Sequence, residues 1–381
     1  MESGIHNMLP REKMAPHVQK FWDFINRKPG APFFQQEFGY YCMEKWQRED
    51  GLPTDVDLGA LFGFDEPALA MINGLGGCEA ALEPEFEVKV LEDRGDYELV
   101  CDRTGRSVLY FKGRRDGFMP EYVDHPVEDQ KSFEEKILWR MDPASPSRQA
   151  AMDEYLPKAQ KMARRGYVVE QYIVGGYMYL RSLIGPERLL YTFYDDPELV
   201  HACMKAWLNL ADNIMARHQK AVSVDLILLD EDICYNCGSL ISPDMIREFL
   251  MPYYQQLLMN ARERRLDKKR PLNIHVGSDG FFDPVIPLYI ECGMSYLSPF
   301  EVAAGSDVVR TGLEYPELNI SGGIDKRVLA TTKDDIDRMV DKIFPKMRAR
   351  GGYIPTCDHG VPEEVPLENY MHYRKRCLEF A

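Results

Sequence analysis

Near the end of this chain, a thiol, a carboxylate and an imidazole stand in three consecutive positions. They are Cys357, Asp358 and His359, and they follow the short apolar stretch 351–356, which reads as a strand. Thiolates, carboxylates and imidazoles are the side chains that most often bind metals or move protons in proteins. The end of this predicted strand is therefore the first candidate for a functional site.

Two further apolar stretches upstream also end in reactive side chains. Residues 226–229 lead into the carboxylates of residues 230–232, and residues 272–274 lead into His275. Three reactive strand ends in one part of the chain predict a single site that is built from several strands.

Helical and strand-like segments alternate from about residue 147 onward. The predicted strands are 167–173, 224–229, 271–276, 294–298, 318–323 and 352–356, and the predicted helices are 147–165, 186–194, 197–220, 243–264, 283–291, 333–349 and 366–379. Such alternation predicts parallel βαβ units. With an additional first strand at 32–38, the pattern favours an α/β fold of the (β/α)8 TIM-barrel type. A doubly wound sheet is the alternative, although no Gly-x-Gly-x-x-Gly follows an early strand.

The first third of the chain carries two additions to this barrel. Residues 1–30 predict an N-terminal helical extension, and residues 85–112 predict an inserted antiparallel β-meander with turns at 93–96 and 102–105. We expect a single domain that spans residues 1–381.

In a (β/α)8 barrel the active site lies at the C-terminal ends of the strands. The residues predicted there are Glu37, 170–172, 230–232, His275, 298–301, Asp325 and 357–359. Asp230 and Asp232 are candidate acid/base groups, because neighbouring carboxylates raise one another's pKa. Tyr172 could face a flat substrate or belong to the core, and Arg181 could hold a substrate carboxylate. With Glu37, they are the candidate substrate-binding residues.

His275 and Cys357 are candidate ligands of Zn²⁺. A catalytic zinc site needs about three protein ligands, and a carboxylate from residues 230–232 could be the third. The alternative is structural: a free cysteine is commonly a small buried hydrophobe, and a histidine after a strand is commonly hydrogen-bonded. Cys234-x-x-Cys237 has no second such pair, so we interpret these two cysteines as packing residues.

Composition limits the class of protein. The 381 residues carry a formal net charge of −15, which argues against a nucleic-acid partner. No apolar run is long enough for a transmembrane helix, and residues 1–11 lack the order of a signal peptide. The nine cysteines are scattered and odd in number, which is typical of reduced thiols in the cytoplasm.

Four segments resemble the uroporphyrinogen decarboxylase superfamily. They are 230–243 (DEDICYNCGSLISP), 273–277 (NIHVG), 321–325 (SGGID) and 351–369 (GGYIPTCDHGVPEEVPLEN), and the resemblance covers roughly residues 150–381. It implies a (β/α)8 barrel, often a homodimer. The superfamily contains cofactor-free decarboxylases of tetrapyrroles and corrinoid-dependent methyltransferases that use zinc.

The resemblance is closest to the methyltransferase branch. His275 and Cys357 match two of its zinc ligands, whereas Gly277 stands where that branch has a cysteine. With Glu231 as a third ligand, the site would suit an oxygen rather than a sulfur substrate. The function implied is O-demethylation: zinc polarises the ether oxygen of a small methoxylated aromatic, and the cobalt of a corrinoid held by a partner protein accepts the methyl group. His359 would then orient ligands or move protons, as would Asp230 and Asp232.

Two alternatives remain. One is a cofactor-independent decarboxylase of a uroporphyrinogen-like or carboxylated aromatic substrate; residues 64–67 (FDEP) fit it, but no arginine cluster accompanies them. The other is a barrel that only binds a corrinoid or a tetrapyrrole.

Overall fold

A seven-stranded parallel sheet forms the centre of the molecule. The computed structural model describes residues 4–115 and 120–381. The strands lie in the order β1–β6–β7–β10–β11–β12–β13, and each neighbouring pair is parallel. Their bounds are β1 (Leu69–Leu75), β6 (Val168–Val174), β7 (Leu226–Asp230), β10 (Asn273–Gly277), β11 (Tyr296–Phe300), β12 (Asn319–Gly322) and β13 (Tyr353–Ile354).

Helices connect the parallel strands, as the alternating pattern predicts. The α-helices are α1 (Pro16–Ile25), α2 (Met43–Glu49), α3 (Leu58–Phe62), α4 (Gln130–Lys136), α5 (Pro146–Ala163), α6 (Gly176–Ile184), α7 (Pro186–Asp195), α8 (Pro197–Ala221), α9 (Pro243–Phe249), α10 (Met251–Glu263), α11 (Ile286–Glu291), α12 (Val308–Glu314), α13 (Lys326–Leu329), α14 (Lys333–Arg350) and α15 (Leu367–Leu378). Short 3-10 helices occupy Arg11–Lys13, Leu138–Met141 and Val302–Ala304, and β8 (Cys234–Tyr235) with β9 (Gly238–Ser239) forms a small hairpin. None of the helices described is long and apolar enough to cross a membrane.

Successive side chains of a strand point to opposite faces of the sheet. In a parallel sheet both faces are usually covered, so apolar residues occur on both sides of its strands. In β7, Ile227 and Leu229 belong to a large apolar cluster with residues of the surrounding helices. Leu226 instead belongs to a second cluster that also contains Tyr296 of β11 and residues of α1 and α5. The two faces of β7 thus contribute to different apolar clusters.

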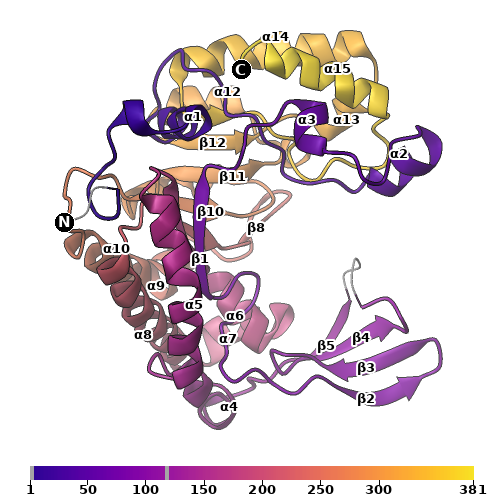
Figure 1. Cartoon of the computed structure of the whole chain (residues 1–381). Coiled ribbons are helices and arrows are strands. Elements are labelled where there is room, and N and C mark those ends of the chain that lie inside the picture. The colour runs from indigo at the N-terminus through magenta and orange to yellow at the C-terminus, as the bar shows by residue number, and fades with distance from the viewer. Residues whose placement is uncertain (1–3, 116–119) are drawn as a thin grey trace.

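Both edge strands of the sheet contribute residues to that second cluster. Ala70 and Ile72 of β1 lie in it together with Ile354 of β13. The parallel sheet with its helical connections is a TIM-barrel-like α/β fold, as predicted. Figure 1 shows the helices outside the strands, with α8 and α10 at the lower left and α14 and α15 at the top.

The predicted first strand at 32–38 is wrong. This segment is extended but forms no ladder, and the first strand of the sheet is β1, which the sequence analysis did not identify. The segment is held mainly from the C-terminal part of the chain: the N–H of Phe33 donates to the carbonyl of Phe380, and the N–H of Tyr41 donates to the carbonyl of Val361. Its extended form therefore comes from tertiary hydrogen bonds rather than from sheet pairing.

The predicted antiparallel meander is present and continues beyond residue 112. Its four strands are β2 (Lys89–Arg94), β3 (Tyr97–Cys101), β4 (Ser107–Phe111) and β5 (Glu121–Asp124). The turn between β2 and β3 uses Gly95 at φ 76°, and Asp93 accepts the N–H of that glycine. Figure 1 shows the meander projecting from the side of the barrel beyond α6 and α7.

Candidate functional site

A cavity of about 390 Å³ lies at the carboxyl ends of the parallel strands. Its wall consists of Phe38, Cys78, Tyr172, Met178, Leu228, Asp230, Asp232, His275, Gly277, Ser278, Asp279, Ser298, Pro299 and His359. Strands β6, β7, β10 and β11 each contribute at least one of these residues. This is the end of the barrel at which the active sites of TIM-barrel enzymes lie.

Asp230, the last residue of β7, is the centre of a small polar cluster. Its Oδ2 accepts hydrogen bonds from the hydroxyl of Tyr172 at 2.8 Å and from the thiol of Cys78 at 3.2 Å. Burial and the Asp230 charge raise the pKa of Tyr172 far above its ordinary value, and the same two causes raise the pKa of Cys78 to about 12. Both side chains therefore stay protonated at neutral pH and act as hydrogen-bond donors rather than as nucleophiles.

His275 lies deeper, in the middle of β10. Its Nε2 is 2.6 Å from the hydroxyl of Ser298, and its ring stacks on Tyr296 with 3.6 Å between the ring centroids. Burial lowers the pKa of His275 to about 3, so the imidazole is neutral. Its buried Nδ1 has no hydrogen-bond partner in the part of the chain that the structure describes.

His359 also lines the cavity, and its pKa is raised, whereas that of His275 is lowered. The Nε2 of His359 lies 3.4 Å from Oδ2 of Asp279, and the resulting hydrogen bond raises the pKa of His359 above its ordinary value. The Nδ1 lies 3.3 Å from the hydroxyl of Tyr41, whose ring stacks on the imidazole. Phe38 packs against the same ring. The cavity wall thus contains a histidine with a raised pKa that contacts two aromatic rings.

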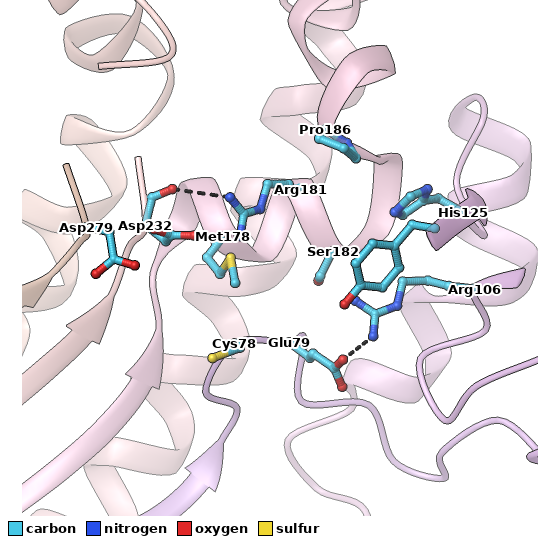
Figure 2. Close-up of a pocket in the computed structure, with 11 residues that line it drawn as sticks. Cys78, Glu79, Arg106, His125, Met178, Arg181, Ser182, Pro186, Asp232 and Asp279 are labelled. Carbon is cyan, nitrogen blue, oxygen red and sulfur yellow. Dashed lines mark hydrogen bonds and ion pairs between the residues drawn. The ribbon is translucent and has the colours of Figure 1, made fainter. Parts of the chain in front are cut away.

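Asp232 adopts a left-handed backbone conformation at φ 40°, which non-glycine residues adopt rarely. Its N–H donates to the carbonyl of Gly277, and its Oδ2 accepts a hydrogen bond from Arg181 at 2.7 Å. Figure 2 shows this ion pair, with Arg181 reaching from α6. Residues that carry backbone strain cluster at functional sites, and here the contacts on both sides of Asp232 stabilise it.

Comparison with known proteins identifies the family. Residues 172–380 match the sequence model of the family described as uroporphyrinogen decarboxylase (URO-D). The chain belongs to the uroporphyrinogen decarboxylase family. The match begins at Tyr172 and includes Asp230, His275 and His359, so it contains most of the cavity wall.

Solved structures show that this family member shares its fold with a methyltransferase from Methanosarcina mazei. The two chains are 14% identical, the likeness covers 96% of this chain and 98% of the other, and the TM-score is 0.58. A methionine synthase of the B12-independent type from a Shewanella species is 12% identical, with coverage of 59% and 64% and a TM-score of 0.34. The second likeness is too distant to carry an argument, and the first shows the fold. No curated protein sequence matches the chain.

The zinc ligands implied by the resemblance do not come together in this family member. Glu231 follows Asp230, and because side chains alternate along a strand it points to the helices when Asp230 points into the barrel. Its two carboxylate oxygens accept the hydroxyl of Tyr254 at 2.6 and 2.7 Å, and burial raises its pKa to about 7. The prediction that Glu231 is a metal ligand beside His275 is therefore wrong.

Cys357 is not poised for zinc either. It is fully buried and does not line the cavity, and burial raises the pKa of its thiol well above the ordinary value. Within residues 4–115 and 120–381 no group of three His, Cys, Asp or Glu side chains could hold a metal ion. Of the three predicted ligands, His275 keeps an unpartnered nitrogen, and one donor does not fit the three-ligand zinc site that the resemblance implies.

Glu37 has a structural position rather than the predicted place against substrate. Its carboxylate accepts the N–H groups of Phe38 and Cys357 and the hydroxyl of Tyr370. These bonds fasten the extended segment 32–38 to the C-terminal part of the chain. Glu37 thereby positions its neighbour Phe38, which does line the cavity.

Several cavity residues were missed by the sequence analysis, among them Cys78, Phe38 and Asp279. Cys78 follows β1, which was not identified as a strand, and Phe38 was only the last residue of the predicted strand 32–38. Asp279 stands two residues after β10, so the rule that strand ends converge could have found it. Of the predicted residues, Asp230, Asp232, Tyr172, His275 and His359 do meet in one cavity, and Arg181 lies at its edge.

Proposed function

We propose that this family member is a methyltransferase that removes a methyl group from a methoxylated aromatic compound. The observation that carries the proposal is the position of His359, which Asp279 holds at a cavity with aromatic walls. Membership of the uroporphyrinogen decarboxylase family and the fold shared with a methyltransferase support it.

An aryl ether needs help to release its oxygen, because a phenolate is a poor leaving group. In the proposed reaction the bond between the methyl carbon and the aryl oxygen breaks, and the electron pair stays on the oxygen. His359 protonates that oxygen as the bond breaks, in place of the hydroxyl of Tyr41 that now contacts its Nδ1. The phenol leaves in neutral form. Acid catalysis of this kind requires no zinc, which agrees with the absence of a fitting ligand set among the described residues.

The methyl group needs an acceptor from outside the chain. Cys78 is the only thiol in the cavity wall within the described residues, and its pKa of about 12 keeps it protonated. The resemblance suggests a reduced corrinoid on a partner protein, which would supply a strong nucleophile for the methyl group. Tyr172 and Asp230 would orient the ring substituents opposite His359.

Decarboxylation is the second candidate, because it is the reaction after which the matched family is named. A polycarboxylate substrate needs unpaired cations. In this cavity Asp230, Asp232 and Asp279 are all acidic, and the nearby Arg181 is already paired with Asp232. The charge of the wall therefore favours a substrate of low charge.

The test is single-turnover chemistry with purified protein. Incubation with methoxyphenols and free reduced cobalamin should yield methylcobalamin, seen by its absorption spectrum, and the demethylated phenol in equal amount. Carbon dioxide released from carboxylated aromatics, with no methyl transfer, would support decarboxylation and overturn the proposal.

A further inference from the structure

A second cavity of about 470 Å³ adjoins the barrel cavity. Cys78, Met178, Asp232 and Asp279 line both spaces, so the two lie on either side of the same residues. We call the second space the meander chamber. Figure 2 shows Cys78, Asp232 and Asp279 on its barrel side.

The far wall of the meander chamber comes from the inserted sheet. Arg106 directly precedes β4, Tyr122 belongs to β5, and His125 directly follows β5. Figure 2 shows Arg106 and His125 across the chamber from Asp279. The insertion thus supplies one wall of the meander chamber.

The side chains of this wall hold one another in place through contacts of Arg106. The guanidinium of Arg106 lies 4.6 Å from the ring centroid of Tyr122, and its Nε donates to Asp102 at 2.7 Å. It also donates to Glu79, which joins the wall to the loop after β1. A ring fixed on one side by a cation can offer its other side to an aromatic ligand.

The cations of the chamber wall are already neutralised. Arg106 is paired with Glu79 and Asp102, and Arg181 is paired with Asp232. His125 is neutral, because burial and then the Arg106 charge lower its pKa to about 4. A carboxylate or phosphate would find no unpaired cation in the described wall. An uncharged aromatic group does not need such a partner, because its burial carries no cost of desolvating a charge.

The size of the two spaces together points to a ligand with two parts. Each cavity alone falls in the range of about 300–1,000 Å³ that is typical for pockets of drug-sized ligands. A single methoxylated ring would occupy only the barrel cavity. A ligand that fills both spaces must extend past Met178 toward the meander.

We propose that the meander chamber binds a second, uncharged aromatic ring of the substrate, with Tyr122 as the residue that selects it. The inference rests on the proposed function for the reaction at the first ring. Binding in the chamber itself is a separate property and is measured without turnover.

The experiment compares two probes by calorimetric titration. One is para-methoxyphenol, and the other is a hydroxy-methoxybiphenyl in which a second ring separates the two substituents. In the wild-type protein the biphenyl should bind about tenfold more tightly, as expected for a stacked ring pair. Tyr122→Ala should abolish this advantage and leave the affinity for para-methoxyphenol unchanged. Tyr122→Leu, which keeps an apolar side chain against Arg106, serves as a second variant should the alanine protein unfold.

The matched control is Tyr97→Ala, which removes a tyrosine from the same sheet that lines neither cavity. Its affinities should equal those of the wild type. Equal binding of both probes by the wild type, or equal weakening of both by the Tyr122 variants, overturns the proposal. Dihydroxybiphenyl, which has no methyl group, should show the same dependence on Tyr122. Such binding without any demethylation of the methoxy compound would leave the chamber assignment standing and refute only the proposed function.

Discussion

The hydroxyl of Tyr172 donates a hydrogen bond to Oδ2 of Asp230 at 2.8 Å, across 58 positions of sequence. The two residues end up together because β6 and β7 are neighbouring parallel strands whose carboxyl ends meet. This bond fixes the orientation of the Asp230 carboxylate at the cavity, and Cys78 adds a second donor to the same oxygen.

Tyr172→Phe removes the stronger donor to Asp230. A hydrogen bond to a charged group contributes about 1.5–3 kcal/mol, so kcat/KM should fall by roughly ten- to a hundredfold. Steady-state kinetics of methyl transfer measures this effect. Tyr253→Phe, which removes a hydroxyl that contacts His201 away from the cavity, should change nothing. An unchanged rate in Tyr172→Phe would show that the cluster around Asp230 plays no part in the reaction.

Asp279→Asn should move the pH dependence of the reaction. The Asp279 hydrogen bond raises the pKa of His359, so the active imidazolium persists to higher pH in the wild type. Activity should be present below that pKa and be lost as the pH rises through it, and the variant should lose activity at a lower pH. The same raised pKa stabilises the fold below the unfolded pKa of histidine and ceases to do so above the folded pKa. NMR titration of His359 together with pH–rate profiles tests both statements; coincident profiles would refute the assignment of His359 as the acid.

Removal of metal should leave the protein intact. Because Glu231, His275 and Cys357 do not form a ligand group, chelator treatment should change neither the rate nor the melting temperature. Elemental analysis of the untreated protein is the accompanying measurement. One zinc per chain, lost together with activity, would contradict the structure.

Glu231→Gln should change how the stability of the protein depends on pH. Burial raises the pKa of the Glu231 carboxyl to about 7 from an ordinary value near 4.5, so the folded state holds a proton there that the unfolded state releases. The stability from this group is complete below the unfolded pKa and is lost as the pH rises to about 7, which amounts to roughly 3 kcal/mol. Urea unfolding between those pH values should show a flatter dependence in the variant. A pH dependence equal to that of the wild type would refute the raised pKa.

Arg270→Met should destabilise the opposite end of the barrel. Arg270 pairs with Asp225, the residue before β7, and the two side chains are 3% and 0% exposed. Loss of one partner of a buried pair costs about 3–5 kcal/mol, because the remaining charge stays buried. Urea denaturation should show this loss. The double variant with Asp225→Leu should recover most of the stability; if it recovers none, the unpaired charge is not the cause.

Much of the site followed from the sequence. The alternation of helices and apolar strands after residue 147 determined a parallel sheet, and the carboxyl ends of such strands must converge. For that reason the sequence alone could predict that Asp230, Tyr172 and His275 lie in one site. The period of two along a strand also implied that Glu231 would face away from Asp230, although the sequence analysis did not apply it.

Only the tertiary structure decided which of the predicted site residues have side chains that line the cavity. Glu37 and Cys357 were predicted to be reactive, yet hydrogen bonds to Cys357 and Tyr370 hold Glu37 outside the cavity wall, and Cys357 is completely buried. Asp279 acquired its importance only through His359, eighty positions away. Residue types and strand periodicity are local properties and can be read from a sequence, whereas burial and the pKa of a side chain depend on what the rest of the chain places around it.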